Sequence, residues 1–360
     1  MTEAAIAALR RSPEWVPHSL DPAGDRWLAV RLSGAQLRAV SFLDARMLGP
    51  QTQAQWLPLS VALDAADGLQ PCRPAMLFHV GHCGSTLLAR LLGELPGLVA
   101  LREPAALRTL AEWDASPEHW WDEAAFLARR DALLALWARP WQPGQRVLLK
   151  ASSFASDLAE GLLVGADTPP ALLLLVAPEV YLATILAQDG NRAEAAALAP
   201  ARLRRLHARL GLPAFRLAAM REGERIAAAW ATEAAALAAA ATSAGPRAML
   251  LDFDGFLAGP AAKLARAAAH LGADCPPAQA EALASGPLMA RYSKGPEHGY
   301  SPDLRARLLA QARAMHGGEI AAGLAWLEAA ARDYPAIAAA LALSARTTAA
   351  AAPAAPAAPA

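Results

Sequence analysis

Short apolar runs alternate with longer segments of helical spacing over the middle of the chain. Five runs are candidate strands, namely Ala75–Val80, Leu98–Leu101, Arg146–Lys150, Ala171–Val176 and Ala248–Phe253. Continuous apolar runs of this length suit strands that are buried on both faces of a parallel sheet. Helical segments lie between them, at Ser85–Leu95, Ala105–Trp113, Asp122–Trp137, Ser153–Leu163 and Pro178–Gln188. The alternation predicts an α/β fold with a mainly parallel sheet.

Three other regions depart from this alternation. Residues 1–70 predict a small N-terminal extension, with a strand over 26–32 and a helix capped by Ser33. Within a main domain of residues 71–345, residues 190–245 are helical without an intervening strand, which predicts a helical insertion over the site. Residues 346–360 are rich in alanine and proline and predict a disordered tail.

Composition narrows the class of protein. The 360 residues are 55% hydrophobic and 18% charged, with 33 basic and 33 acidic side chains, so nothing indicates a nucleic-acid surface. The longest apolar run, 171–187, contains a proline and a glutamate, and we expect no membrane span. No signal-peptide core is visible at the N-terminus. Cys72, Cys83 and Cys275 form neither a metal-ligand spacing nor a disulfide framework, so we expect a cytoplasmic protein without a metal.

The most informative stretch joins the first strong strand to the next helix. The strand runs into a tight loop, and a helix begins at once on Gly84-Ser85-Thr86. Free N–H groups at a helix N-terminus attract a phosphate or sulfate. The Walker A pattern requires a lysine after its last glycine, but Ser85 stands there, and His79 replaces the first glycine. The residues therefore predict an anion site that is not of the Walker A type.

Residues 82–88, His-Cys-Gly-Ser-Thr-Leu-Leu, resemble the phosphosulfate loop of the sulfotransferase family, which typically reads Lys/Arg-Ser-Gly-Thr/Ser-Thr-Leu-Leu. Similar landmarks follow in order: a Glu103-Pro104 pair, Lys150 at a strand end, Thr184 in the position of a serine, and residues 250–260 near an acidic "Tyr-Glu-Asp-Leu…Pro" segment. The resemblance covers residues 75 to about 275. It implies a three-layer P-loop-type fold and sulfuryl transfer from 3′-phosphoadenosine 5′-phosphosulfate to a hydroxyl or amine of a small molecule.

The resemblance also implies residue roles. Cofactor binding falls to residues in and near the loop, namely His82, Cys83, Gly84, Ser85, Thr86 and Thr184. Catalysis falls to three residues: Glu103 as general base, Lys150 as a charge at the sulfuryl group, and His82 at the bridging oxygen, where the family has Lys or Arg. Each has a structural alternative, respectively a carboxylate at a helix N-terminus, a strand-terminal lysine and a plain loop histidine.

The chain departs from the family at the far phosphate. Val176 and Glu179 stand where the family has arginines. Compensating charge is available from the helical face of Arg202, Arg205 and Arg209, or from the stretch Arg291–Gly295 that contains Lys294. A solvated helix face and a turn are the alternatives for these two groups.

Five tryptophans, at positions 113, 120, 121, 137 and 141, fit either an apolar acceptor pocket or core packing. The sequence thus predicts a sulfotransferase-like enzyme. One alternative is a non-catalytic or repurposed family member that binds an anion or nucleotide. Another is a small-molecule kinase, against which the missing Walker lysine argues.

Overall fold

Five parallel strands form the central sheet of this computed structural model, which describes residues 2–70, 72–114, 120–165, 168–291, 299 and 301–351. The strands are β4 (Ala75–His79), β5 (Leu98–Arg102), β6 (Arg146–Lys150), β7 (Ala171–Leu175) and β8 (Ala248–Asp252). Their order is β5-β6-β4-β7-β8, and every neighbouring pair is parallel. The predicted α/β fold is confirmed, and each strand lies within one residue of its predicted ends.

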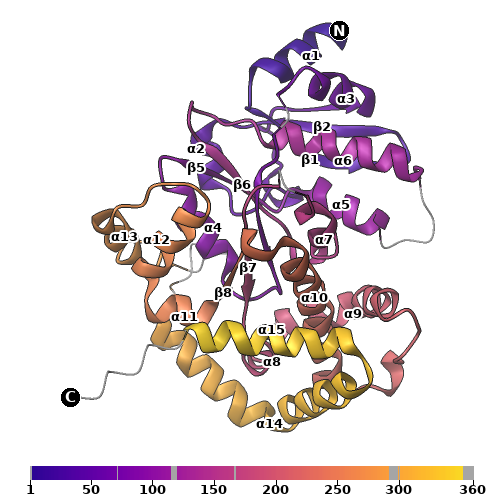
Figure 1. The fold of residues 1–360 in the computed structure, drawn as a ribbon, viewed down its shortest axis with the longest axis vertical. Coiled ribbons are helices and arrows are strands. Elements are labelled where there is room, and N and C mark those ends of the chain that lie inside the picture. Colours follow the sequence, from indigo (N-terminus) through magenta and orange to yellow (C-terminus); the bar gives the residue numbers. More distant parts are fainter. Residues whose placement is uncertain are drawn as a thin grey trace.

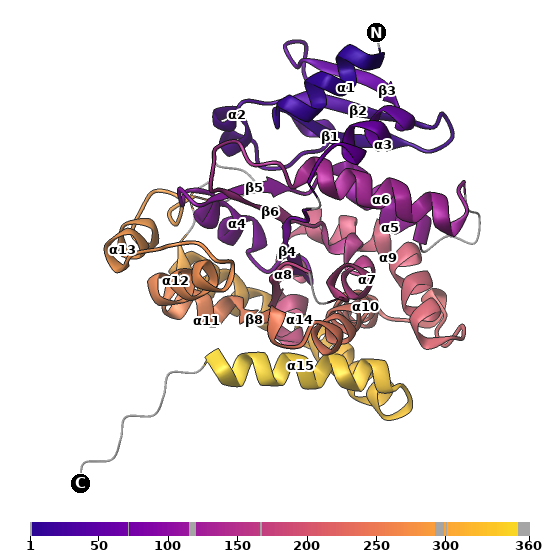
Figure 2. The same cartoon turned by 45° about the horizontal axis from the view of Figure 1, so that its top comes forward.

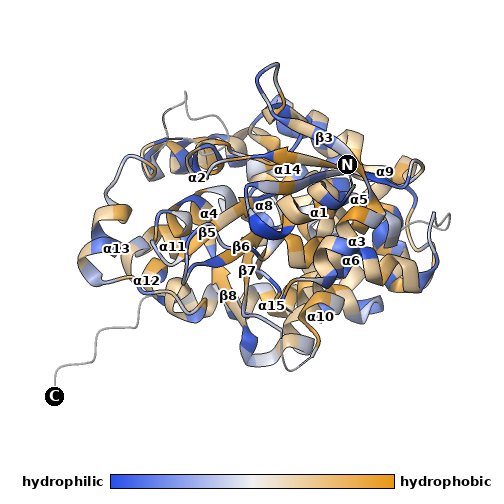
Figure 3. Ribbon diagram, turned by 90° about the horizontal axis from the view of Figure 1, so that it is seen from above, coloured by the Kyte–Doolittle hydropathy of each residue, from blue (hydrophilic) through white to orange (hydrophobic). Residues whose placement is uncertain are grey.

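Burial on both faces explains why these runs become strands. Every residue of β4, β5 and β7 is buried, as the continuous apolar pattern predicts. Helix α4 (Ser85–Gly93) packs on β5 and β6, whereas α10 (Glu222–Ala244) packs on β4, β7 and β8. Figure 1 shows α4 on one side of the sheet and α10 on the other, and Figure 3 shows largely hydrophobic central strands. The result is a three-layer arrangement with its apolar core around β4.

The remaining helices connect and flank the strands. They are α5 (Ala105–Asp114), α6 (Glu123–Trp137), α7 (Leu158–Leu163), α8 (Pro178–Leu186), α9 (Asp189–Leu210), α11 (Phe253–Ala258), α12 (Pro260–His270), α13 (Pro277–Ala284), α14 (Pro302–Asp333) and α15 (Pro335–Ala351). Short 3₁₀ helices are η2 (Ser153–Ala155), η3 (Leu217–Ala219) and η4 (Gly245–Arg247). The predicted helix over 153–163 is therefore divided into η2 and α7.

Two predicted regions differ in detail from the structure. Residues 190–245 are helical, but α10 is buried around most of its surface and packs against α14, α15 and the sheet. It is a core helix and does not form a covering insertion, because its many alanines allow close packing on all sides. Residues 346–351 belong to α15, which continues to Ala351, so the helix enters the stretch predicted as a tail. Residues 352–360 lie outside the described residues.

The N-terminal region has its own antiparallel sheet, in the order β1-β2-β3. Its elements are α1 (Thr2–Arg11), β1 (Trp15–Asp21), β2 (Arg26–Arg31), α2 (Gly34–Ala39), η1 (Ala45–Met47), β3 (Ala54–Pro58) and α3 (Leu59–Asp67). Ser33 caps α2 through a capping box with Gln36, as predicted. Contacts of α3 with α6 and of β1 with α5 dock this sheet against the α/β part (Figure 2).

Two buried arginines fasten the N-terminal region to the α/β part. Arg139, which follows α6, donates to the carbonyl oxygens of Leu9, Ser12 (2.6 Å) and Trp15 (2.7 Å). Arg102, at the end of β5, donates to carbonyl oxygens of residues 37, 38 and 40. Burial lowers the pKa of each guanidinium to about 10. Carbonyl oxygens solvate these charges where a carboxylate is the usual partner.

Most of the five tryptophans between positions 113 and 141 pack in the core. Trp137 is buried and donates to the carbonyl of Pro17 (2.8 Å), and Trp141 donates to that of Leu32 (3.3 Å). Trp113 stacks on Phe126 with ring centroids 3.9 Å apart. Trp121 is buried, whereas Trp120 is exposed. The packing alternative is therefore correct for four of the five.

Across the described residues, none of the helices combines the length and the apolar character needed to cross a membrane.

Replacing Arg139 with alanine is expected to destabilise the fold by about 2–4 kcal/mol, because buried carbonyl groups lose their donors. Denaturant unfolding followed by circular dichroism measures this change. Arg31→Ala is the matched control, since its ion pair with Glu14 is exposed and is expected to contribute less than about 1 kcal/mol. Equal effects of the two substitutions would contradict the fastening role of Arg139.

Candidate functional site

The turn from β4 to α4 lies at the carboxyl edge of the sheet, next to its central strand. Gly81, His82 and Gly84 all have positive φ, at 85°, 47° and 69°. Gly84 is the N-cap of α4, and a Cβ added there would clash with the ring of Phe253 from α11. Both the backbone conformation and the close approach of Phe253 therefore require glycine at position 84.

Donors at the start of α4 have no partner among the described residues. The N–H groups of residues 85–87 make no hydrogen bond to any described residue, as expected for a first helical turn without a side-chain cap. The Thr86 hydroxyl is buried and likewise has no partner in the described part of the chain. A buried polar group without a partner is costly, and an anion at this helix N-terminus would satisfy these donors.

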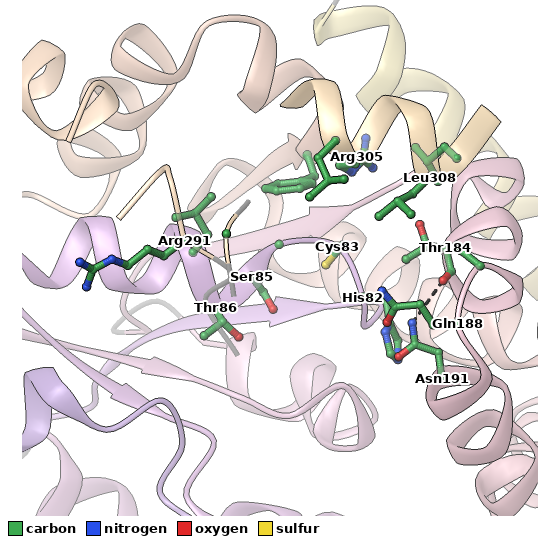
Figure 4. A pocket seen from close by; sticks show the side chains of 17 residues that line it. His82, Cys83, Ser85, Thr86, Thr184, Gln188, Asn191, Arg291, Arg305 and Leu308 are labelled. Atoms are coloured by element: carbon green, nitrogen blue, oxygen red, sulfur yellow. Dashed lines mark hydrogen bonds between the residues drawn. The ribbon is translucent and has the colours of Figure 1, made fainter. Parts of the chain in front are cut away.

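A cavity of about 500 Å³ opens at this helix N-terminus (Figure 4). All six residues predicted to bind the cofactor line it, namely His82, Cys83, Gly84, Ser85, Thr86 and Thr184. Further lining comes from α8, α9, α11 and α14, including Gln188, Asn191, Phe253 and Arg305. The sequence did not single out these last four, because segments far apart in the chain bring them together. A helix-capping serine before α14 is the nearest sequence signal to Arg305.

Thr184 lies on the wall of the cavity opposite α4 in Figure 4. Its hydroxyl donates to the Val180 carbonyl of its own helix (2.7 Å), and Asn191 donates to the Thr184 carbonyl (3.2 Å). To donate to an anion, the Thr184 hydroxyl must rotate away from Val180. The position therefore suits a ligand contact that forms on binding.

Glu103 and Lys150 form a second group of predicted site residues. Lys150 at the end of β6 is fully buried, and its Nζ donates to Glu103 Oε1 at the end of β5. The Glu103 side chain is 19% exposed, and Oε2 accepts no hydrogen bond from a described residue. This pair does not line the cavity around Gly84. The structural reading of Lys150 as a solvated strand-terminal side chain is wrong, because the side chain is enclosed.

His79 connects the two groups. Its Nδ1 accepts a hydrogen bond from the Gly81 N–H (2.9 Å), and its Nε2 lies 3.0 Å from the Ala151 carbonyl oxygen and 4.0 Å from Glu103 Oε1. Because Nδ1 accepts, Nε2 carries the proton that is donated to Ala151. The last residue of β4 thus ties the turn to the end of β6, beside the Glu103 carboxylate.

The side chain of His82, a residue of the turn, lies near α9. Its Nε2 is 3.9 Å from Glu194 Oε2, and its ring meets Tyr181 edge-on at a centroid distance of 6.3 Å. Tyr181 is buried, and burial raises the pKa of its hydroxyl. His82 thus lies near a carboxylate of α9.

Two of the three predicted catalytic residues, His82 and Glu103, have a left-handed backbone conformation. Among the described residues only Asp25, His82 and Glu103 combine a side chain with positive φ. Each such residue costs about 1 kcal/mol relative to a right-handed conformation. Two of these three positions are those that the resemblance assigns to catalysis, which is where local strain is often retained.

The arginine face predicted on α9 does not reach the cavity. Arg205 pairs with Asp157 and with the fully buried Glu233 (2.9 Å), and these partners raise its pKa. Arg202 lies 3.5 Å from Glu233, and Arg209 bonds Asp157 (3.0 Å). Both proposed readings of this face, an anion site and a solvated face, are wrong. The charges form an internal network because three carboxylate and hydroxyl groups from α10 and the 156–157 segment face them.

The two positions that lack the family's arginines have ordinary partners. Val176 is buried, and its carbonyl accepts from Trp230 Nε1 (3.1 Å). Glu179 bonds Arg313 of α14 at 2.7 and 2.8 Å, which lowers the pKa of its carboxyl. Arg291 lines the cavity, whereas Lys294 and Gly295 lie outside the described residues.

Within the described ranges, no group of three or more His, Cys, Asp and Glu side chains is placed to hold a metal ion.

No protein-family model matches the sequence. The curated proteins contain no match to it either. Solved structures with a similar fold include two sulfotransferases. A sulfotransferase domain from the curacin biosynthetic pathway is 12% identical, with a TM-score of 0.39 over 68% of this chain and 98% of that domain. A sulfotransferase from Alicyclobacillus acidocaldarius is 16% identical, with a TM-score of 0.34 over 71% and 95% of the two chains. These values describe a distant similarity, which does not by itself assign the chain to a family.

Replacing Gly84 with alanine is expected to lower stability by at least about 2 kcal/mol, because the left-handed conformation and the contact with Phe253 both oppose a Cβ. The double variant Gly84→Ala/Phe253→Ala removes the clash but keeps the backbone strain. It is therefore expected to show a favourable coupling energy in a thermodynamic cycle measured by thermal unfolding. Strictly additive effects would contradict the contact between Gly84 and Phe253.

Proposed function

We propose that this protein is a sulfotransferase that moves a sulfuryl group from 3′-phosphoadenosine 5′-phosphosulfate to a hydroxyl or amine of a small molecule. One observation carries the proposal: the N–H groups of residues 85–87 and the buried Thr86 hydroxyl have no partner among the described residues, and these residues line one cavity. A phosphosulfate supplies acceptor oxygens for all of them. The order of the family-like landmarks along the chain supports the same donor.

Sulfuryl transfer depends mainly on how the reactants are positioned and on how the developing charge is stabilised. The acceptor oxygen or nitrogen forms a bond to sulfur while the bond from sulfur to the bridging phosphate oxygen breaks. Negative charge develops on the leaving bisphosphate, which the α4 N-terminus and His82 would stabilise. The acceptor's proton goes to a base, and Glu103 Oε2 is the proposed one.

Lys150 and His79 support this role for Glu103. Lys150 Nζ occupies Oε1, so the carboxylate presents its other oxygen. His79 holds the turn at a fixed position beside the same carboxylate. The base and the anion site would therefore be coupled through the ends of β4, β5 and β6.

The alternative is a protein that binds an anion or nucleotide without catalysis. Its supporting observation is that the Glu103–Lys150 pair does not line the cavity around Gly84. A small-molecule kinase is less well supported, because no lysine follows Gly84.

Thermal unfolding with three ligands separates these functions. A ligand that binds only the native state stabilises it. Adenosine 3′,5′-bisphosphate is therefore expected to raise Tm, and ATP at the same concentration is expected to raise it much less. Equal stabilisation by inorganic sulfate would indicate a plain anion site. Stabilisation by ATP alone would favour the kinase, and no shift with any ligand would contradict the proposed function.

Replacing Glu103 with glutamine is expected to lower kcat about 10²–10⁴-fold, because the amide cannot take the acceptor's proton. Affinity for adenosine 3′,5′-bisphosphate, measured by calorimetry, is expected to change little. Glu112→Gln on α5 is the control, since that side chain is exposed and pairs only with Arg108 in the described structure. Full activity of Glu103→Gln would remove Glu103 from the role of base.

A further inference from the structure

The cavity around Gly84 has a cation on the wall contributed by α14. Arg305 lines the cavity near the start of that helix, and its side chain is only 16% exposed (Figure 4). Leu304, Leu308 and Leu309 of the same helix line the cavity around it. This wall is therefore apolar except for one guanidinium.

An aromatic ring separates Arg305 from the anion-binding turn. The Arg305 guanidinium carbon lies 5.5 Å from the ring centroid of Phe253, and the same ring packs against Gly84. A ligand that places one anionic group on the α4 N-terminus can therefore extend past Phe253 and place a second one on Arg305. The cavity volume of about 500 Å³ is that of a typical small-molecule site.

Arg305 has N–H donors that could bind a second anionic group. Its Nη1 donates to Asp254 Oδ1 of α11, and no other nitrogen of Arg305 bonds a described residue. Asp254 is 39% exposed and fixes the guanidinium over Phe253. A guanidinium held on one side can still present two parallel N–H groups to a phosphate.

The neighbouring arginines of α14 and α9 are engaged in ion pairs, whereas Arg291, which also lines the cavity, is exposed. Arg313 lies further along α14 and forms a two-point pair with Glu179, and it does not line the cavity. The arginines of α9 are held by Glu233 and Asp157. Position 176, where the resemblance led us to expect an arginine, holds a buried valine.

We propose that Arg305 is a specificity-determining residue that binds the second anionic group of the ligand, at a distance from the group held by α4. The proposal rests on the proposed function, because it takes the nucleotide 3′-phosphate as that second group. In this chain the charge that selects a bisphosphate comes from α14, and Val176, which follows β7, supplies none. Asp254 opposes the site electrostatically while it orients Arg305.

Calorimetry with two nucleotides tests this role. The measured quantity is the discrimination factor, the Kd of adenosine 5′-monophosphate divided by the Kd of adenosine 3′,5′-bisphosphate. The wild-type factor is expected to exceed about ten, and Arg305→Gln is expected to lower it at least about tenfold, the effect of one charge-assisted hydrogen bond. The Kd of the monophosphate is expected to stay within about threefold, because that nucleotide does not reach Arg305.

Two further variants keep the test independent of folding effects. Asp254→Asn removes the opposing charge and is expected to raise the discrimination factor several-fold. Arg313→Gln removes a cation from the same helix outside the cavity and is expected to leave the factor unchanged. Circular dichroism and Tm establish that each variant is folded.

The outcomes separate the two proposals. If the wild type discriminates but Arg305→Gln weakens both nucleotides equally or neither, Arg305 has no role at the second group and only the further proposal fails. Equal affinity of the wild type for both nucleotides also overturns the further proposal, because the ligand then has no second anion subsite. If neither nucleotide binds the wild type, the proposed function itself fails.

Discussion

The end of strand β4 is the constraint on which the rest of the structure depends. Because β4 is central and buried on both faces, its chain must turn at the carboxyl edge of the sheet. The turn is made by Gly81, His82 and Gly84 in left-handed conformations, and Phe253 closes over Gly84. This geometry leaves the N-terminus of α4 open toward the cavity. The same strand places His79 against the end of β6 and beside Glu103.

The N-terminal region takes part in positioning the candidate catalytic pair. Arg102 precedes Glu103, and its guanidinium is held by carbonyl oxygens around the end of α2. The backbone on either side of Glu103 is also bound, since the N–H of Leu43 donates to the Arg102 carbonyl (2.7 Å) and the Glu103 N–H donates to that of Lys150 (2.7 Å). A residue with positive φ persists only where its surroundings fix it. The small N-terminal region supplies part of that fixation and is more than an appended unit.

Many basic side chains of the α/β part are held by acidic partners. Basic side chains in the α/β part are mostly paired or buried: Arg205 with Glu233, Arg313 with Glu179, and Lys150 with Glu103. Removing one partner of a buried pair, such as Arg205–Glu233 or Lys150–Glu103, leaves an uncompensated charge, which costs more than the pair contributes. Arg305 differs because, within the described part of the chain, it pairs with Asp254 alone and through one nitrogen. That difference makes it the cation of this wall that is suited to an external anion.

The sequence by itself determined the five strands, the helices that alternate with them and the turn at Gly84, because these depend on local apolar runs and on glycine's freedom at positive φ. The resemblance also assigned the loop residues and Thr184 to one ligand, and these residues line one cavity. Only the tertiary structure decided the partners of charged groups. Regular spacing on α9 did not reveal that Glu233, on another helix, holds Arg205, and nothing local marked Arg305. Such pairings join residues that are distant in the chain, and they are fixed by how buried helices pack together.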